Sequence, residues 1–223
     1  MIARRQWIAL SLGAALALRL GVLRETLAAG KLEKGVYRVR GEARVNGAPA
    51  REGMDVKAGD VITTGRDGEL VFVIGKDAML VRANARVEVS GRAAALVADG
   101  LRIVTGAVLS VFSPGARRTI TVRTATIGIR GTAVYVEDMS DRAYVCTCYG
   151  VADIAAQDDL AVHETVQTEH HDQPRYIYPA GTAQRIVRAP VVNHSDAELI
   201  LLESLVGREP PFVAREDWVP GRY

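Results

Sequence analysis

Short runs of apolar and β-branched residues, separated by residues typical of turns, recur from Val36 to about Ile154. The runs span Val36–Val39, Ala43–Val45, Val61–Thr63, Glu69–Val73, Met79–Val81, Arg86–Val89, Leu101–Val104, Ala107–Phe112, Thr119–Val122, Ala133–Val136 and Tyr144–Cys148. Pairs such as Asn46-Gly47 and Asp67-Gly68 mark turns between them. Because the short strands follow one another at even spacing without a helical period, the pattern predicts a mainly β fold: a sandwich, a roll or a solenoid-like stack of strands.

One helix is predicted near the end of the chain. Ser195 and Glu198 have the spacing of a capping box, in which each side chain satisfies a backbone N–H of the other residue. The apolar face that follows consists of Leu199, Leu202, Leu205 and Val206, and Gly207 is a typical stop. We expect a helix over about residues 195–206. A helix of about three turns is not stable alone, so it should pack on the β strands.

The first 29 residues are typical of an export signal. Arg4-Arg5 precedes an apolar run from Trp7 to Leu18, and small residues follow at 28–30. The run has about a dozen residues, whereas a membrane-spanning helix needs about 20, so we expect a cleaved leader and no span after cleavage. The arginine pair followed by an aromatic residue is typical of a twin-arginine signal, and an ordinary secretory leader is the alternative. Both imply a periplasmic protein.

The length of 223 residues allows one domain, or one domain with a small appendage. We therefore divide the chain into an export signal (1–29), a β domain (30–155) and a C-terminal extension with strands, the helix and an irregular tail (156–223). The net charge is +2, but residues 1–30 contain four arginines and one glutamate, so the rest is nearly neutral. A nearly neutral chain argues against nucleic-acid binding by phosphate neutralisation.

Five motifs occur in the order found in one known family. They are residues 57–65 (KAGDVITTG), 69–82, 101–109, 124–134 (TATIGIRGTAV) and 145–154. From about residue 36 to 155 the chain thereby resembles the FecR domain of bacterial envelope regulators. The residues that we take as the fold signature are Gly59, Asp60, Gly65, Arg130, Gly131, Thr132 and Gly150. The glycines among them suit turns or a close approach of strands.

The resemblance implies a role in the cell envelope of a Gram-negative bacterium. Known members of the family have a periplasmic FecR domain that relays a signal from an outer-membrane transporter to a cytoplasmic sigma factor. Here only six residues precede the apolar run, so direct control of a sigma factor is not expected. The resemblance therefore implies a non-enzymatic interaction or regulatory module whose partner is another envelope protein.

The chain has two cysteines, Cys146 and Cys148, on one predicted strand. Alternate residues of a strand share a face but lie roughly 6.6 Å apart, whereas the Cβ atoms of a disulfide lie about 3.8 Å apart. A regular strand therefore does not allow a disulfide here, although Gly150 would permit a kink and exported proteins usually oxidise their cysteines. Three interpretations stay open: buried apolar residues, a labile redox pair, or two thiolates for zinc or copper.

A metal site would need further ligands, and all the histidines follow the cysteines: His163, His170, His171 and His194. Adjacent residues of a strand face opposite ways, so only one of His170 and His171 could join a site. The candidate metal or redox set is Cys146, Cys148, one of His170 and His171, and Asp172. The spacing matches no established zinc motif. In the alternative interpretation, residues 170–172 are a polar turn.

Motifs that would indicate catalysis do not occur in the sequence. The chain contains no G-x-S-x-G nucleophile motif, no H-E-x-x-H zinc motif and no phosphate-binding loop. We therefore expect a protein that is not an enzyme. The main hypothesis is an exported FecR-like regulatory module, and the alternative is a small periplasmic sensor of metal or redox state that uses the two cysteines.

Overall fold

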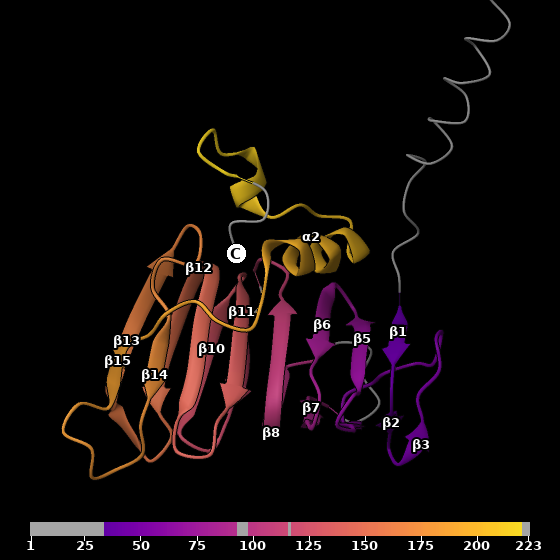
Figure 1. The fold of residues 1–223 in the computed structure, drawn as a ribbon, viewed down its shortest axis with the longest axis horizontal. Coiled ribbons are helices and arrows are strands. Elements are labelled where there is room, and N and C mark those ends of the chain that lie inside the picture. Colours follow the sequence, from indigo (N-terminus) through magenta and orange to yellow (C-terminus); the bar gives the residue numbers. More distant parts are fainter. Residues whose placement is uncertain (1–33, 93–97, 116, 220–223) are drawn as a thin grey trace, which may run out of the picture. The chain divides into compact units, whose positions relative to one another are not determined.

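The computed structural model describes residues 34–92, 98–115 and 117–219 (Figure 1). The predicted export signal lies outside these residues. All the described residues belong to one compact unit, Leu32–Tyr223. None of the described helices is both long and apolar enough to cross a membrane.

The described residues form fifteen strands, one α-helix and one short 3-10 helix, which confirms the predicted mainly β fold. The strands are β1 (Gly35–Arg40), β2 (Ala43–Val45), β3 (Ala48–Pro49), β4 (Val61–Thr64), β5 (Glu69–Ile74), β6 (Asp77–Val81), β7 (Arg86–Ser90), β8 (Gly100–Val111), β9 (Arg117–Thr121), β10 (Ala125–Arg130), β11 (Ala133–Asp138), β12 (Ala143–Ala156), β13 (Asp159–Thr168), β14 (Arg175–Ile177) and β15 (Ile186–Arg188). The helices are α2 (Asp196–Leu205) and η1 (Pro211–Ala214).

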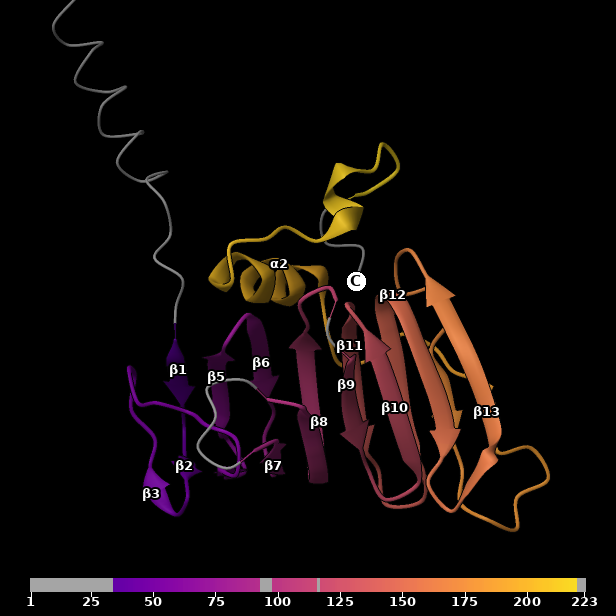
Figure 2. The same cartoon turned by 180° about the vertical axis from the view of Figure 1, so that it is seen from behind.

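Two sheets are built from these strands, and two long strands belong to both. Sheet A contains β1, β5, β6, β11, β14 and β15, sheet B contains β2, β3, β4, β7, β9, β10 and β13, and both contain parts of β8 and β12. Figure 2 shows β9, β10 and β13 from the side of sheet B. Aliphatic side chains of the two sheets, such as Leu70 and Ile127, meet in one buried core. The arrangement is therefore a sandwich with shared strands.

Each shared strand changes sheet at a glycine. Residues 100–105 of β8 pair with β7 in sheet B, and residues 106–111 pair with β11 in sheet A. Likewise, the first half of β12 pairs with β11 and the second half, from Gly150, pairs with β13. Gly106 and Gly150 have φ values of 80° and 90°, which L side chains rarely adopt. A Cβ atom on Gly150 would also lie 2.6 Å from the Thr132 hydroxyl.

Helix α2 packs on sheet A across one end of β6 and β8, as Figure 1 shows. The Ser195 N–H donates to the Glu198 carboxylate at 3.0 Å, so the predicted capping box forms and the helix begins one residue later. Leu199 and Leu202 are fully buried against sheet A. Glu198 also pairs with Arg82 at 2.7 Å. Because sheet A is covered on both faces here, β5 is apolar from Leu70 to Ile74 and β6 from Ala78 to Val81, instead of alternating.

Residues 156–219 extend the same architecture. β13 pairs with the second half of β12, β14 pairs with its first half, and β15 pairs with β14. The predicted boundary at residue 155 falls at the end of β12, inside the β12–β13 hairpin. The β domain and the C-terminal extension therefore share their sheets.

Candidate metal centre

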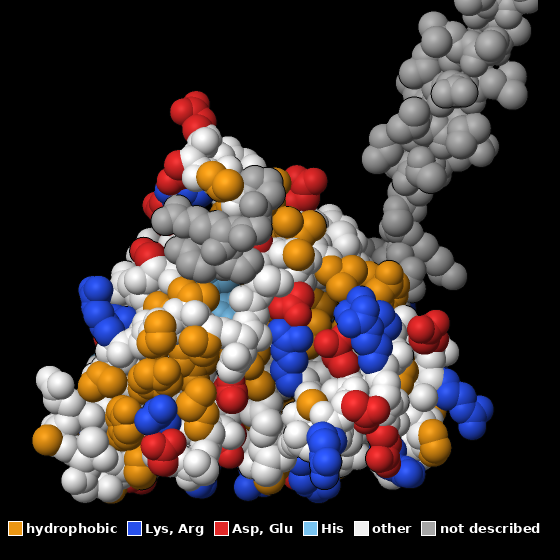
Figure 3. Space-filling view, in the orientation of Figure 1, with side chains coloured by type: hydrophobic (Ala, Val, Ile, Leu, Met, Phe, Trp, Pro, Cys, Tyr) orange, Lys and Arg blue, Asp and Glu red, His pale blue; other side chains and the backbone are white. Residues whose placement is uncertain are grey.

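Strand β12 presents its two cysteines on the outer face of sheet A. Cys146 and Cys148 are fully buried and are not joined by a disulfide. They share a face because they lie two residues apart, whereas Val145 points into the core between the sheets. Both thiols therefore lie in the layer that the C-terminal segment covers. Histidine occupies only a small area of the surface on this side of the molecule (Figure 3).

His171 comes from the connection between β13 and β14. Its backbone N–H donates to the carbonyl oxygen of Cys148 at 2.9 Å, which fixes the residue beside the cysteines. Its φ of 53° is left-handed, a conformation that costs a non-glycine residue about 1–2 kcal/mol. The ring is buried, and its Nδ1 atom lies 3.5 Å from the sulfur of Cys146.

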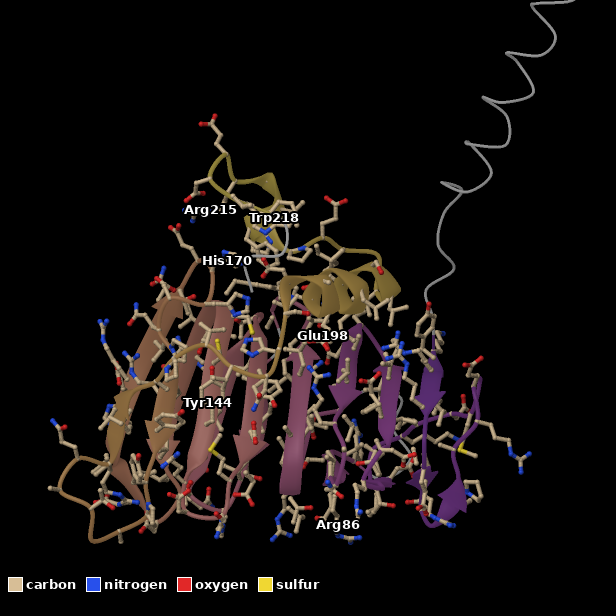
Figure 4. The ribbon with its side chains drawn as sticks, in the orientation of Figure 1. Arg86, Tyr144, His170, Glu198, Arg215 and Trp218 are labelled. Atoms are coloured by element: carbon tan, nitrogen blue, oxygen red, sulfur yellow. The ribbon has the colours of Figure 1, made fainter. Side chains whose placement is uncertain are left out.

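His194 reaches the same place from the segment before α2. The Tyr144 hydroxyl, on β12 (Figure 4), accepts the Val192 N–H at 3.2 Å and so holds this segment against sheet A. The His194 ring stacks on Tyr135, with ring centroids 4.7 Å apart and planes inclined by 9°. Its Nε2 atom then lies 3.0 Å from Nδ1 of His171.

Four ligand atoms of the kinds that bind zinc converge here. They belong to Cys146, Cys148, His171 and His194, which we call the Cys2His2 site, and all lie within 4.8 Å of one another. With Zn–S bonds of about 2.3 Å and Zn–N bonds of about 2.0–2.1 Å, a tetrahedral ion places sulfur and nitrogen about 3.5 Å apart and two nitrogens about 3.3 Å apart. The observed separations of 3.5 Å and 3.0 Å are close to these values.

Hydrogen bonds on the outer side of both imidazoles occupy one ring nitrogen of each residue and leave the other facing inward. His194 Nδ1 lies 2.7 Å from the Val192 carbonyl oxygen, which can only accept, so Nδ1 carries the proton. His171 Nε2 lies 3.2 Å from the Asp196 carboxylate, which also accepts. The inner nitrogens, Nε2 of His194 and Nδ1 of His171, lie 3.0 Å apart. Both could bind one cation, and imidazoles supported by carboxylate or carbonyl oxygens are typical of metal sites.

Asp196, the first residue of α2, connects several of these groups. One carboxylate oxygen accepts from His171 and from His170, the latter at 2.8 Å, and the other accepts from the Trp218 indole N–H at 3.0 Å. Burial raises the pKa of Asp196, but the hydrogen bonds from His170 and Trp218 together outweigh this effect. The pKa of Asp196 therefore lies below its ordinary value. Asp196 is therefore a carboxylate that orients the ring of His171.

The pKa values of the two thiols are shifted in opposite directions. Burial raises the pKa of Cys146, but hydrogen bonds with Cys148, His171 and His194 outweigh this, and the pKa lies well below its ordinary value. Burial raises the pKa of Cys148 well above its ordinary value, and the neighbouring Cys146 raises it further. A divalent ion that binds both sulfurs would bind them as thiolates and displace any proton that they carry.

Of the candidates predicted from sequence, three belong to the Cys2His2 site: Cys146, Cys148 and His171. His170 lies outside the four ligands and forms a hydrogen bond with the Asp196 carboxylate. Asp172 is exposed and does not belong to the site, because the left-handed turn at His171 carries the chain back towards solvent.

Sequence analysis missed two residues of this region, His194 and Asp196. The one local signal that could have found them is the start of α2, because both residues flank its N-cap, Ser195. Nothing in the local sequence indicates that this helix end docks over β12, some 50 residues earlier in the chain. The docking depends on sheet order and not on spacing along the chain.

The fold-signature residues lie outside the Cys2His2 site, at turns, at strand ends and, for Gly150, at the point where β12 changes sheet. They are Gly59, Asp60, Gly65, Arg130, Gly131, Thr132 and Gly150. Asp60 accepts the Lys57 N–H at 2.8 Å within a turn, and Arg130 pairs with Asp153 at 2.6 Å across neighbouring strands. These contacts shape the fold and bring no reactive groups together.

Comparisons with known proteins found similar solved structures. No family model matches the chain, and no curated protein matches it. Two crystal structures of a candidate anti-sigma factor from Parabacteroides distasonis, at 1.65 Å and 2.50 Å resolution, are similar at 9% sequence identity. The matches cover 58% of this chain and 59% of the other, with TM-scores of 0.46 and 0.47. At this level the likeness carries no conclusion about function.

Proposed function

We propose that this protein is an exported, non-enzymatic regulatory module of the bacterial cell envelope whose Cys2His2 site binds a zinc ion. The convergence of four buried ligand atoms from three separate segments carries the proposal. The FecR-like sequence signature and the export signal support the regulatory role and the periplasmic location. Its partner would be another envelope protein.

The charge of the site favours zinc over monovalent copper. Two thiolates and two neutral imidazoles carry a charge of about −2, which a divalent ion cancels and a monovalent ion does not. An uncompensated charge is costly in a site as buried as this one. The Asp196 carboxylate lies outside this ligand set and is stabilised by hydrogen bonds with His170, His171 and Trp218.

The ligand set also favours a structural or regulatory ion over a catalytic one. Catalytic zinc ions have three protein ligands and an open position for water or substrate, whereas structural ions have four protein ligands. Here four protein ligands are available and all are buried. This supports a protein that binds zinc to set its conformation and not to perform a reaction.

The test is to measure bound metal in the purified protein. We expect one zinc per chain, lost on denaturation, and sulfur-to-metal charge-transfer bands after replacement by cobalt(II). Cys146→Ser and His194→Ala should each abolish stoichiometric binding. His163→Ala is the matched control, because His163 is exposed and lies outside the site. Metal-free protein with two free thiols after zinc addition, or with a disulfide, would contradict the proposal.

Copper(I) is tested in the same way under reducing conditions. If copper(I) displaces zinc at equal concentrations, the site is a copper site and the charge argument is wrong. If zinc remains bound, the choice of ion stands.

A further inference from the structure

The C-terminal arm, which we define as residues 210–219, lies directly beside the Cys2His2 site. Phe212 is fully buried, and its ring stacks on that of His170 with centroids 4.4 Å apart. Arg215 forms an ion pair with Glu169, the residue just before His170. The arm therefore rests on the same β13–β14 connection that supplies His171. Figure 4 shows His170, Arg215 and Trp218 gathered beyond the end of β12.

A single carboxylate joins the arm to the site. Asp196 holds His171 through one oxygen at 3.2 Å and holds the indole N–H of Trp218 through the other at 3.0 Å. Asp196 is almost completely buried, so both bonds form in a poorly solvated place. A change in the position of His171 therefore alters the hydrogen bonding of Asp196, which also anchors Trp218.

We propose that zinc in the Cys2His2 site controls the docking of the C-terminal arm, with Asp196 as the positioning residue that couples the two. This inference rests on the proposed function. With zinc bound, Nδ1 of His171 binds the ion and its Nε2–H holds Asp196 in place for Trp218. Without zinc, no ion holds the rings of His171 and His194 to the two sulfurs, so the ring of His171 can move and the support of Asp196 changes.

The rest of α2 does not depend on this coupling. Leu199 and Leu202 are buried against sheet A, Glu198 pairs with Arg82, and none of these residues belongs to the Cys2His2 site. Zinc release should therefore loosen the arm and leave the helix docked. The protein would thereby convert the presence of zinc into a change at its surface, which a partner could recognise.

The coupling must be reciprocal. If zinc favours the docked arm by some factor, the docked arm favours zinc by the same factor, and couplings of this kind usually amount to about 5- to 150-fold. This gives a quantitative test, since the two factors come from different measurements. The effect of zinc on arm docking should equal the effect of the arm on zinc affinity.

The experiment uses Trp218 as a probe. The chain has two tryptophans, and the other, Trp7, lies in the predicted leader, so the exported protein should report on Trp218 alone. Removal of zinc by a chelator should shift the Trp218 emission towards that of solvent-exposed indole. Hydrogen exchange should rise in residues 210–219 and stay unchanged in β5 and β6, which serve as the internal control.

Two variants separate coupling from mere structural support. Trp218→Phe keeps an aromatic ring but removes the N–H donor, so the protein should still bind zinc, several-fold more weakly, and arm exchange should no longer depend on zinc. Asp196→Asn should weaken zinc binding about 10- to 100-fold, as loss of a carboxylate behind a histidine ligand usually does. Its cobalt(II) spectrum should change as well, because the ring of His171 is reoriented.

The outcomes distinguish the two proposals. If the protein binds and releases zinc while Trp218 emission and arm exchange stay constant, the coupling is wrong and the proposed function stands. If arm exchange in Trp218→Phe still responds to zinc, the route through Asp196 is wrong. If the protein binds no zinc at all, the proposed function is wrong and the coupling is wrong with it.

Discussion

The two faces of sheet A differ in chemistry, although they belong to the same strands. The face towards sheet B packs almost purely aliphatic side chains, such as Val134, Val136 and Val145. The face towards α2 carries both cysteines and three tyrosines, and buried polar groups adjoin it, including Asp196 and Glu203. The aliphatic layer between the sheets therefore holds the fold together. The layer under α2 is a mixed core in which polar groups contact one another.

The largest effect should come from the aliphatic layer. Ile127→Ala, on β10, should reduce the free energy of unfolding by about 2–5 kcal/mol, because it leaves a cavity between the sheets. Denaturant unfolding measures this loss. The loss should be the same with zinc and with a chelator, since Ile127 does not adjoin the Cys2His2 site; a zinc-dependent loss would break the distinction between the layers.

The mixed layer should behave in the opposite way. At a free zinc concentration about 100 times the dissociation constant, binding to the folded state alone adds about 2.7 kcal/mol to the free energy of unfolding. Cys148→Ala should abolish this gain and change the stability of the zinc-free protein much less, because alanine fills most of the buried position of the thiol. Thermal unfolding with and without zinc checks both statements. An equal zinc effect in the variant would contradict them.

The crossing of β12 between the layers should show an intermediate effect. Gly150→Ala places a Cβ atom 2.6 Å from the Thr132 hydroxyl at a φ of 90°, so we expect a loss of about 1–3 kcal/mol. Adding Thr132→Ser to Gly150→Ala should recover little of the lost stability, because serine keeps the hydroxyl and the backbone strain at residue 150 remains. Gly47→Ala is the control for backbone strain alone, since its φ is also positive but no atom lies within 4 Å. Equal losses at both positions would exclude the clash as a cause.

The smallest effect concerns the ion pair between Glu164 of β13 and Arg175 of β14. The hydrogen bond from Arg175 lowers the pKa of Glu164 below its ordinary value. A lowered folded-state pKa stabilises the fold above the unfolded-state pKa of about 4.3, and this contribution disappears as the pH falls through the folded-state pKa. Glu164→Gln should therefore make the free energy of unfolding of the zinc-free protein fall slightly less steeply as the pH is lowered. Curves that superimpose would show that this half-exposed pair contributes nothing.

Local pattern predicted most of the strands but not how they share sheets. The runs at 101–104 and 107–112 look like two strands with a glycine between them, and they are one strand, β8, that bends at Gly106. Glycine marks both a turn and a bend, so the sequence does not separate the two. The start of α2 was predictable to within a residue because its capping box is a contact between neighbours.

The candidate site was half predictable for a related reason. Cys146 and Cys148 share a face through strand geometry alone, which depends only on their spacing. His194 joins them through the path of the chain from β15 to α2, and only the folded sheet order determines where that path runs. The choice between His170 and His171 also depended on the left-handed conformation of His171, which the local sequence does not specify.

The sharing of β8 and β12 makes the two sheets a single cooperative unit. A sandwich of two separate sheets can lose one edge strand and keep the opposite sheet intact. Here the chain cannot be cut within β12 without removing a neighbour from β11 and β14 on one side and from β10 and β13 on the other. We therefore expect one unfolding transition for residues 34–219, and no fragment that ends within β12 should fold into half of the protein.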